Sequence, residues 1–341
     1  LMSIWDKLEA QQKTQANTVL QANTSTINAL LKPSEGESFE DNWNRIATHF
    51  NTLYGCTLPM PKGDGRQKKH LVGLENVKAF KQVILELGFT GKLSNYHEGD
   101  QPAIDTVRRI NTIRKEMIDS GEVKKKVVPP IDNEGSTNYP SHWKQVRLME
   151  LTELITKGSS PKWQGVEYIE EAADSVLFVT SENVASYTIN LAKKKYVEKK
   201  FNDIEPRSIL RIGDLLTNIV GASIGRTAIF NLDCVANINQ AVCIIRLLQH
   251  SINKEFLLHF FNSNYCLKMM FENQVENARA NLSMGNIEKF IIPFPPLEEQ
   301  KRIVAKVDEL MCICDKLEEQ LTEAYCDAET MMQATVKSLV A

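Results

Sequence analysis

The chain has 341 residues, of which 43% are hydrophobic and 24% charged, and its formal net charge is −3 at pH 7. This length indicates at least two structural units, and the near-neutral charge argues mildly against a simple nucleic-acid-binding protein. No apolar run reaches membrane-spanning length and the seven cysteines have no scaffold-like spacing, so we expect a cytoplasmic protein with reduced thiols.

Residues 1–32 are predicted to form a long helix. Its opening phrase, LMSIWDKLEAQ, returns at Leu310 as LMCICDKLEEQ, with eight of eleven positions identical. The later copy follows a long lead-in, whereas the earlier one starts at residue 1, so we expect this first helix to be truncated at its start. Its polar stretch, residues 11–28, carries few charges and is expected to take part in partner contact.

Residues 33–138 read as a helical region followed by a linker. One helix carries Phe80 and Ile84 on its apolar face. A shorter helix runs from about Pro102 to Ser120, with Gly121 as its stop. The stretch after it, VKKKVVPPIDNEGSTNYP, is typical of an exposed linker.

Residues 139–296 show a different pattern, in which short β-branched runs are broken by Gly, Asn and Asp. These runs are VLFVTSENV, SILRIGDLLTNIV, RTAIFNLD and AVCIIRLL. The later segment KEFLLHFFNSNYCLKMMFENQ is helical in character. We therefore expect a compact α/β (α+β) domain here, flanked by helices.

Residues 297–341 are predicted to form a second long helix. Prolines precede it, and Glu298 and Glu299 stand in its first turn, where the helix dipole favours acids. Apolar residues recur in alternating steps of three and four, at Ile303, Val307, Leu310, Cys314, Leu317, Leu321, Ala324, Ala328 and Met331. Such a narrow seam needs a partner helix, and residues 1–31, antiparallel to it, are the expected one. Cys312 and Cys314 are read as ordinary helix residues rather than metal ligands.

The order of these segments resembles a known family. The segments that carry the resemblance are TKGSSPKW, FVTSEN, GDLLTNIVGASIGRTAIF, ANINQAVCIIR, ARANLSMGNIEKFIIPFPPLEEQKRIV, NWNRIATHFNTLY, AFKQVILELGFTGKL and VKKKVVPPI with HWKQVRLMEL. Together they look like the specificity subunit of type I restriction-modification systems, and IPFPPLEEQKRIV is specific to that family. The resemblance covers nearly the whole chain.

The resemblance implies a tandem arrangement of target-recognition domains and long helices that pack antiparallel as a coiled-coil spacer. This chain looks like a form that lacks its first recognition domain. The implied function is to read one half of a bipartite DNA target and to dock methylase subunits, probably two copies. The restriction subunit is expected to join through the methylase, and S-adenosylmethionine and ATP are expected in partner subunits.

The residues themselves offer no catalytic constellation. The segment IPFPP lacks the Asn or Asp that an amino-methylase uses to hold an exocyclic amine, and GASIG is not a phosphate-binding loop. The six histidines have no metal-ligand spacing, and no Ser, His and Asp grouping stands out. We therefore expect a non-catalytic subunit with neither metal nor cofactor.

Candidate DNA contacts are polar residues in the loops of residues 139–296. Arg reads guanine, Asn and Gln read adenine, and small polar groups hold phosphate. The predicted contacts are Lys157, Ser159, Ser160, Lys162, Trp163, Thr180, Ser181, Asn183, Asn218, Ser223, Arg226, Asn239, Gln240, Arg279 and Asn281. Arg226 and Lys162 are the strongest, and the Lys-rich run 193–200 adds at most sequence-blind attraction.

Each of these residues also has a plainer interpretation. Asn218, Asn237 and Asn239 are residue types that shape turns, and Trp163 could plug a half-buried surface. For the whole chain the competing interpretation is a coiled-coil assembly protein without DNA recognition. A catalytic methylase is a third, weakened by the missing amine-binding loop.

Overall fold

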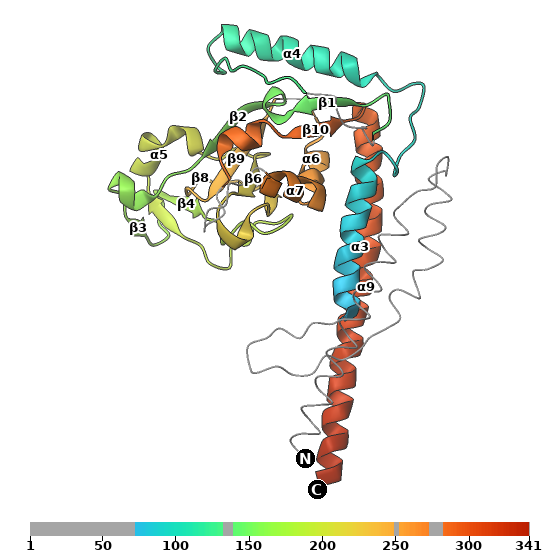
Figure 1. Cartoon of the computed structure of the whole chain (residues 1–341). Coiled ribbons are helices and arrows are strands. Elements are labelled where there is room, and N and C mark those ends of the chain that lie inside the picture. The colour runs from blue at the N-terminus through green and yellow to red at the C-terminus, as the bar shows by residue number, and fades with distance from the viewer. Residues whose placement is uncertain (1–71, 132–138, 249–251, 273–281, 341) are drawn as a thin grey trace. The chain divides into compact units, whose positions relative to one another are not determined.

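The structure, a computed structural model, describes residues 72–131, 139–248, 252–272 and 282–340 (Figure 1). These residues belong to two compact units. One unit contains the described residues 72–88 and 305–340, and the other contains those of 89–304. The predicted first helix, residues 1–32, lies outside the described residues, so its antiparallel pairing with the C-terminal helix stays a prediction.

The first unit contains most of two helices, α3 (Val72–Phe89) and α9 (Leu297–Val340). They lie side by side in Figure 1. Lys81 of α3 places its Nζ 2.7 Å from Asp315 Oδ1 and 2.6 Å from Glu318 Oε2. The sequence indicated residues 1–31 as the partner of α9; among the described residues its neighbour in this unit is α3.

The predicted long helix is present as a continuous 44-residue helix, and its apolar seam is buried along its first half. Ile303, Val307 and Leu310 are buried, whereas Met331 is 71% exposed. Cys314 is buried and Cys312 is exposed, as expected for ordinary residues two positions apart on a helix.

The second unit mixes helices and strands, which confirms the predicted mixed class. Its helices are α4 (Ala103–Asp119), α5 (Lys200–Ile204), α6 (Lys254–Phe261), α7 (Asn264–Glu272) and α8 (Met284–Glu288), with short 3-10 helices η1 (Leu148–Glu150), η2 (Pro161–Gln164), η3 (Pro206–Ser208) and η4 (Gly221–Ser223). Its strands are β1 (Lys144–Arg147), β2 (Thr152–Lys157), β3 (Tyr168–Ile169), β4 (Ser175–Val179), β5 (Tyr196–Glu198), β6 (Leu215–Asn218), β7 (Thr227–Ile229), β8 (Ala236–Ile238), β9 (Val242–Leu247) and β10 (Ile291–Phe294).

Two four-stranded sheets share one core. Their strand orders are β2-β9-β6-β7 and β3-β5-β4-β8. Leu177 and Val179 of β4 pack with Leu216 of β6 and Ile244 of β9 in a single cluster. The alternate residues of β4 belong to a second cluster, in which Phe178 meets Phe201 of α5. Sheet β3-β5-β4-β8 is therefore buried on both faces around β4, which explains the nearly continuous apolar run in its sequence.

The segment read as one helix after Asn253 is two helices. Asn253 caps α6 by accepting a hydrogen bond from Phe256 N at 2.7 Å. The break falls at Asn262 and Ser263, because Ser263 Oγ accepts from Cys266 N and the Asn262 amide donates to Thr227 O at 3.0 Å. Both side chains take up backbone groups that a continuous helix would otherwise use.

Helix α4 is anchored on the domain of residues 139–296. It ends as predicted before Gly121, whose φ of 82° suits a helix stop. The buried guanidinium of Arg114 donates to Thr152 O at 2.9 Å and also to Met149 O. The second unit thus contains both α4 and the domain predicted from residue 139.

The start of β6 and the end of β9 are joined by a buried ion pair. Arg246 Nε and Nη2 donate to Asp214 Oδ1 and Oδ2, both at 2.7 Å, and Nη2 also donates to Ile209 O at 2.9 Å. This two-pronged contact satisfies both partners, so neither charge is buried alone.

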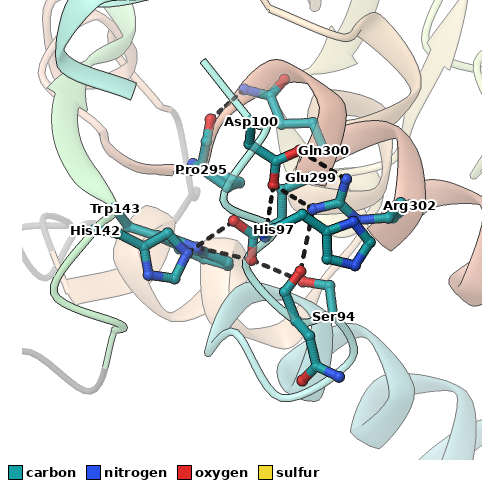
Figure 2. A network of polar contacts seen from close by, with 10 residues as sticks. Ser94, His97, Asp100, His142, Trp143, Pro295, Glu299, Gln300 and Arg302 are labelled. Carbon is teal, nitrogen blue, oxygen red and sulfur yellow. Dashed lines mark hydrogen bonds and ion pairs between the residues drawn. The ribbon is translucent and has the colours of Figure 1, made fainter. Parts of the chain in front are cut away.

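A polar network holds the place where the chain enters and leaves the recognition domain. Strands β1 and β10 pair antiparallel, from Lys144 opposite Phe294 to Arg147 opposite Ile291, and so bring the residues before β1 next to those after β10. Figure 2 shows the result around Glu299, whose side chain is fully buried. Its carboxylate accepts from Ser94 Oγ (2.9 Å) and Trp143 Nε1 (3.1 Å) and lies 2.8 Å from His142 Nε2.

The neighbouring residues of α9 extend this network. Gln300 donates to Pro295 O at 2.9 Å and accepts from Asn253 N at 2.9 Å. Arg302 pairs with Asp100 through contacts of 3.0 Å and 2.5 Å, also visible in Figure 2. The predicted role of Glu299 as a dipole-favoured acid is therefore incomplete, because its carboxylate fastens segments from three parts of the sequence.

We expect Glu299→Gln to destabilise the protein by about 1–3 kcal/mol, because the buried charge that accepts hydrogen bonds from Ser94 and Trp143 would be replaced by a neutral amide. The matched control is Glu298→Gln, since Glu298 is exposed and pairs with Lys301, and it should cost less than about 0.5 kcal/mol. Thermal unfolding measures both. Equal small effects would show that the Glu299 contacts contribute little.

The pH dependence of stability should report the Asp100 pair. The hydrogen bond from Arg302 lowers the pKa of the Asp100 carboxyl to about 2, below its unfolded value of about 3.9. A depressed folded pKa adds stability above the unfolded value, and that stability is lost as pH falls through about 2. We expect Asp100→Asn to flatten this acid decline in an unfolding series. Asp105→Asn, at an exposed pair, should leave it unchanged.

Candidate nucleic-acid interface

The loops predicted to read DNA begin at strand ends that meet at one edge of the domain. Strands β4 and β8 run parallel with Val179 opposite Ile238, so the residues after both strands leave the sheet together. Asn239 N donates to Val179 O at 3.1 Å and ties these two exits. In the other sheet, Lys157 at the end of β2 and Asn218 at the end of β6 lie opposite the first two residues of β9.

Two contacts join the exits of the two sheets. A Cβ on Gly158 would lie 1.9 Å from Ile238 O, so the loop after β2 passes directly against the backbone at the end of β8. The Asn218 amide donates to Ser181 O and Val184 O, both at 3.0 Å, and so fastens the loop after β4 to the end of β6. We call residues 158–164, 180–195, 219–226 and 239–241 the loop cluster.

The outer surface of the loop cluster carries several of the predicted contacts. Exposed side chains include Lys162, Arg226 and, at the border of the cluster, Lys157. Trp163 is 75% exposed, which excludes the interpretation that its side chain fills a half-buried surface. The partly exposed predicted contacts are Ser159, Ser160, Ser181, Ser223, Asn239 and Gln240. An exposed indole among cations and small polar groups is suited to contact with nucleic acid.

Three predicted contacts lie inside the domain instead. Thr180, Asn183 and Asn218 are buried. Asn183 Oδ1 accepts from Thr180 N and Oγ1 at 2.9 Å and 3.0 Å, while its amide donates to Asn190 O and Lys193 O at 3.0 Å each. These side chains shape the loops and are not placed to touch a base, which corrects the prediction for all three.

The remaining asparagines divide in the same way. Asn237 is buried and donates to Asn202 Oδ1 at 2.8 Å, so the turn-shaping interpretation holds for it. Asn239 Oδ1 accepts from Ala241 N at 3.1 Å, yet the side chain is partly exposed at the cluster. Arg279 and Asn281 lie outside the described residues.

Two residues at the cluster had no distinguishing signal in the sequence. Gln164 donates to Ser159 Oγ at 3.0 Å and to Glu205 Oε1 at 2.9 Å, which fixes the loop that presents Trp163. Tyr187 has a φ of 68°, the one positive value at a non-glycine residue in the described chain, and its N donates to Thr227 O at 2.8 Å beside Arg226. A strained backbone conformation of this kind persists only where surrounding contacts hold it. No sequence motif marks either Gln164 or Tyr187.

The Lys-rich run is partly neutralised by carboxylates. Lys195 lies 3.0 Å from Glu182 and Lys200 lies 2.7 Å from Glu198. The hydrogen bonds from these lysines lower the pKa of both glutamates, so both carboxylates are charged near neutrality. Lys193, Lys194 and Lys199 are exposed. The run therefore offers less free positive charge than its sequence suggests.

The described residues hold no group of three or more His, Cys, Asp or Glu that could bind a metal ion. The buried thiols are poorly suited to nucleophilic chemistry, because burial raises the pKa of Cys243 to about 12 and that of Cys266 well above its usual value. Across the helices that the structure describes, none is long and apolar enough to cross a membrane.

Comparison with known proteins identifies the class to which this arrangement belongs. Residues 140–324 match the family described as Type I restriction modification DNA specificity domain, and the chain belongs to that family. The resemblance noted from the sequence is thereby confirmed.

Individual relatives agree with this assignment. The chain is 26% identical over 329 residues to the specificity subunit of the type I restriction enzyme EcoAI of Escherichia coli, covering 93% of this chain and 51% of that protein. It is 22% identical over 335 residues to the EcoEI specificity subunit of the same organism, covering 95% and 52%. The chain thus spans about half the length of these relatives. The crystal structure of the HsdS subunit from Thermoanaerobacter tengcongensis is similar with a TM-score of 0.41 and 20% identity, covering 76% of this chain and 53% of that one.

We expect Gly158→Ala to destabilise the recognition domain by about 1–3 kcal/mol, because the added Cβ would meet backbone atoms that cannot rotate away. Gly99→Ala is the matched control, since a Cβ there meets nothing within 4 Å. Thermal unfolding compares the two variants. An unchanged midpoint for Gly158→Ala would mean that the loop is not held against β8.

Proposed function

We propose that this chain is a non-catalytic DNA-specificity subunit that reads one half of a bipartite DNA target through the loop cluster. The observation that carries the proposal is the convergence of four loops, distant in sequence, on one edge of a rigid scaffold. Hydrogen bonds inside the domain hold these loops, while Lys162, Trp163 and Arg226 extend outward. Loops placed on a rigid framework in this way are the usual location of binding residues.

The exposed side chains suit two kinds of contact with duplex DNA. The Arg226 guanidinium can donate two hydrogen bonds to guanine O6 and N7, and Gln240 or Asn239 can bind adenine. Lys157, Lys162 and the partly exposed serines suit phosphate oxygens, which position the protein without specifying sequence. The cluster thus combines reading and positioning groups, as a recognition surface requires.

We further propose that the chain assembles with two methylase subunits, and with a restriction subunit through the methylase. Exposed apolar residues on α9, Ile313 and Met331, support a partner-binding role for this helix. The proposed spacer is α9 paired as a coiled coil with the helix expected over residues 1–32. Methyl transfer and ATP hydrolysis, with their cofactors S-adenosylmethionine and ATP, are assigned to the partners.

Selection from a pool of random-sequence duplexes, with and without an added methylase subunit, tests the function directly. We expect the recovered sequences to share a short motif that corresponds to one half-site. Recovery of no motif under either condition, together with stable methylase binding, would favour a coiled-coil assembly protein without DNA recognition.

Arg226→Ala should weaken binding to the selected sequence by about 1–3 kcal/mol and relax the preference at one base position. Lys194→Gln, in the Lys-rich run, should instead weaken binding to all sequences by a similar small factor. Titration of both variants against selected and scrambled duplexes measures the difference. Neither variant should shift the unfolding midpoint, and unfolding of the Arg226 variant would identify Arg226 as a structural anchor.

A further inference from the structure

A basic groove runs along β2 on the recognition unit, apart from the loop cluster. Strand β2 lies at the edge of its sheet and pairs only with β9. The groove has a volume of about 670 Å³ and lies between β2, the end of α4 with the residues after it, and the segment around η3. Val123, Met149 and Ile155 among its lining residues are buried, so they form a floor beneath charged walls.

The walls of the groove carry more positive than negative side chains. Its cations are Arg114, Lys124, Lys126, Arg207, Arg211 and Arg246, and its carboxylates are Glu122, Glu153 and Glu288. Four of the cations have partners. Arg246 binds Asp214, Lys126 binds Glu288, Arg211 lies 3.2 Å from Glu153, and Arg114 donates to backbone carbonyls.

Lys124 and Arg207 are the two groove cations that have no ion-pair partner among the described residues. Both are exposed, and neither lies within ion-pair distance of a carboxylate in the described chain. They belong to different parts of the groove, one to the segment after α4 and one to η3. These two cations outnumber Glu122, the one groove carboxylate without an ion-pair partner in the described chain, so the groove favours an anionic occupant.

The groove connects with the loop cluster through η3. Glu205, directly before η3, accepts a hydrogen bond from Gln164 at 2.9 Å, and Gln164 follows Lys162 and Trp163. Arg207 therefore stands close in the chain to the residue that supports the reading loop. Strand β2, along which the groove runs, has six residues and so spans roughly 20 Å at about 3.3 Å per residue.

We propose that the groove along β2 binds the phosphate backbone of duplex DNA next to the half-site read by the loop cluster. This inference rests on the proposed function. Duplex DNA carries one charge per roughly 1.7 Å of its axis, so a groove of this length passes several phosphates. DNA fits better than a protein partner because the groove presents cations on its walls while much of its apolar lining is buried beneath them. The contact is blind to sequence, since Lys124 and Arg207 reach phosphate and not base edges.

The test is a double variant, Lys124→Gln with Arg207→Gln, in the full chain. Its control is Lys301→Gln, which removes an exposed cation from the first turns of α9, where Lys301 pairs with Glu298 at 2.8 Å. Affinity is titrated over a series of salt concentrations on two probes, the selected duplex and a random-sequence duplex, both long enough to extend beyond the half-site. Truncated duplexes that end at the half-site complete the set.

We expect the double variant to reduce the slope of log affinity against log salt by about 1.8, which is 0.9 for each lost phosphate contact. Affinity should fall by the same factor on both long probes, and the preference for the selected sequence should persist. Truncated duplexes should show no effect of the variant. The Lys301 control should match the wild type throughout.

Three results would overturn the inference. If the double variant keeps the wild-type slope on long duplexes, no phosphate lies in the groove, even though wild-type binding would still support the proposed function. If the variant binds DNA normally but loses a methylase subunit, the groove holds an acidic protein surface. If the wild-type chain shows no affinity for either long duplex, the proposed function itself fails, and the inference fails with it.

Discussion

The buried carboxylate of Glu299 holds together the segments at which the chain enters and leaves the domain of residues 139–296. It accepts hydrogen bonds from Ser94 and Trp143 and contacts His142, so it joins the segment after α3, the start of the domain and the first turn of α9. A buried carboxylate is tolerated only when donors surround it. The motif FPPLEEQ thus connects these segments. Its prolines end β10, and Glu299 accepts hydrogen bonds from Ser94 and Trp143. Gln300 binds Pro295 O and Asn253 N.

The same physical rule shapes the loop cluster. Asn183 binds backbone carbonyls within its own loop, and Asn218, at the end of β6, binds two carbonyls of that same loop, which gives the loop a fixed conformation without regular secondary structure. The close approach at Gly158 adds a contact that no larger residue allows. Buried amides therefore hold the loop of residues 180–195 and the close approach at Gly158 holds that of residues 158–164, while the exposed side chains of the loop cluster extend outward.

Some of this structure could be predicted from the sequence, because local signals determine it. The apolar runs that became β4, β6, β7 and β9, the stop at Gly121 and the long α9 follow from composition and periodicity. Strands β1 and β10 were missed, since each has four residues and pairs across more than a hundred positions. Asn183 and Asn239 were both candidates in the sequence. Only tertiary burial separates them, because an amide that shapes a loop and one that reads adenine are chemically identical.

This division between buried and exposed polar residues bears on how a recognition domain can change its target. An exposed Lys162, Trp163 or Arg226 contributes little to the core, so its replacement can alter the proposed DNA contacts at a small cost in stability. Replacement of Asn183 or Asn218 removes the donor from two backbone carbonyls in each case, which costs about 1–3 kcal/mol for each group left buried and unsatisfied. Target preference can therefore change through the outward residues while the buried amides keep the loops together. The buried residues that position the loops and the exposed residues proposed to contact DNA therefore contribute separately to the stability of one domain.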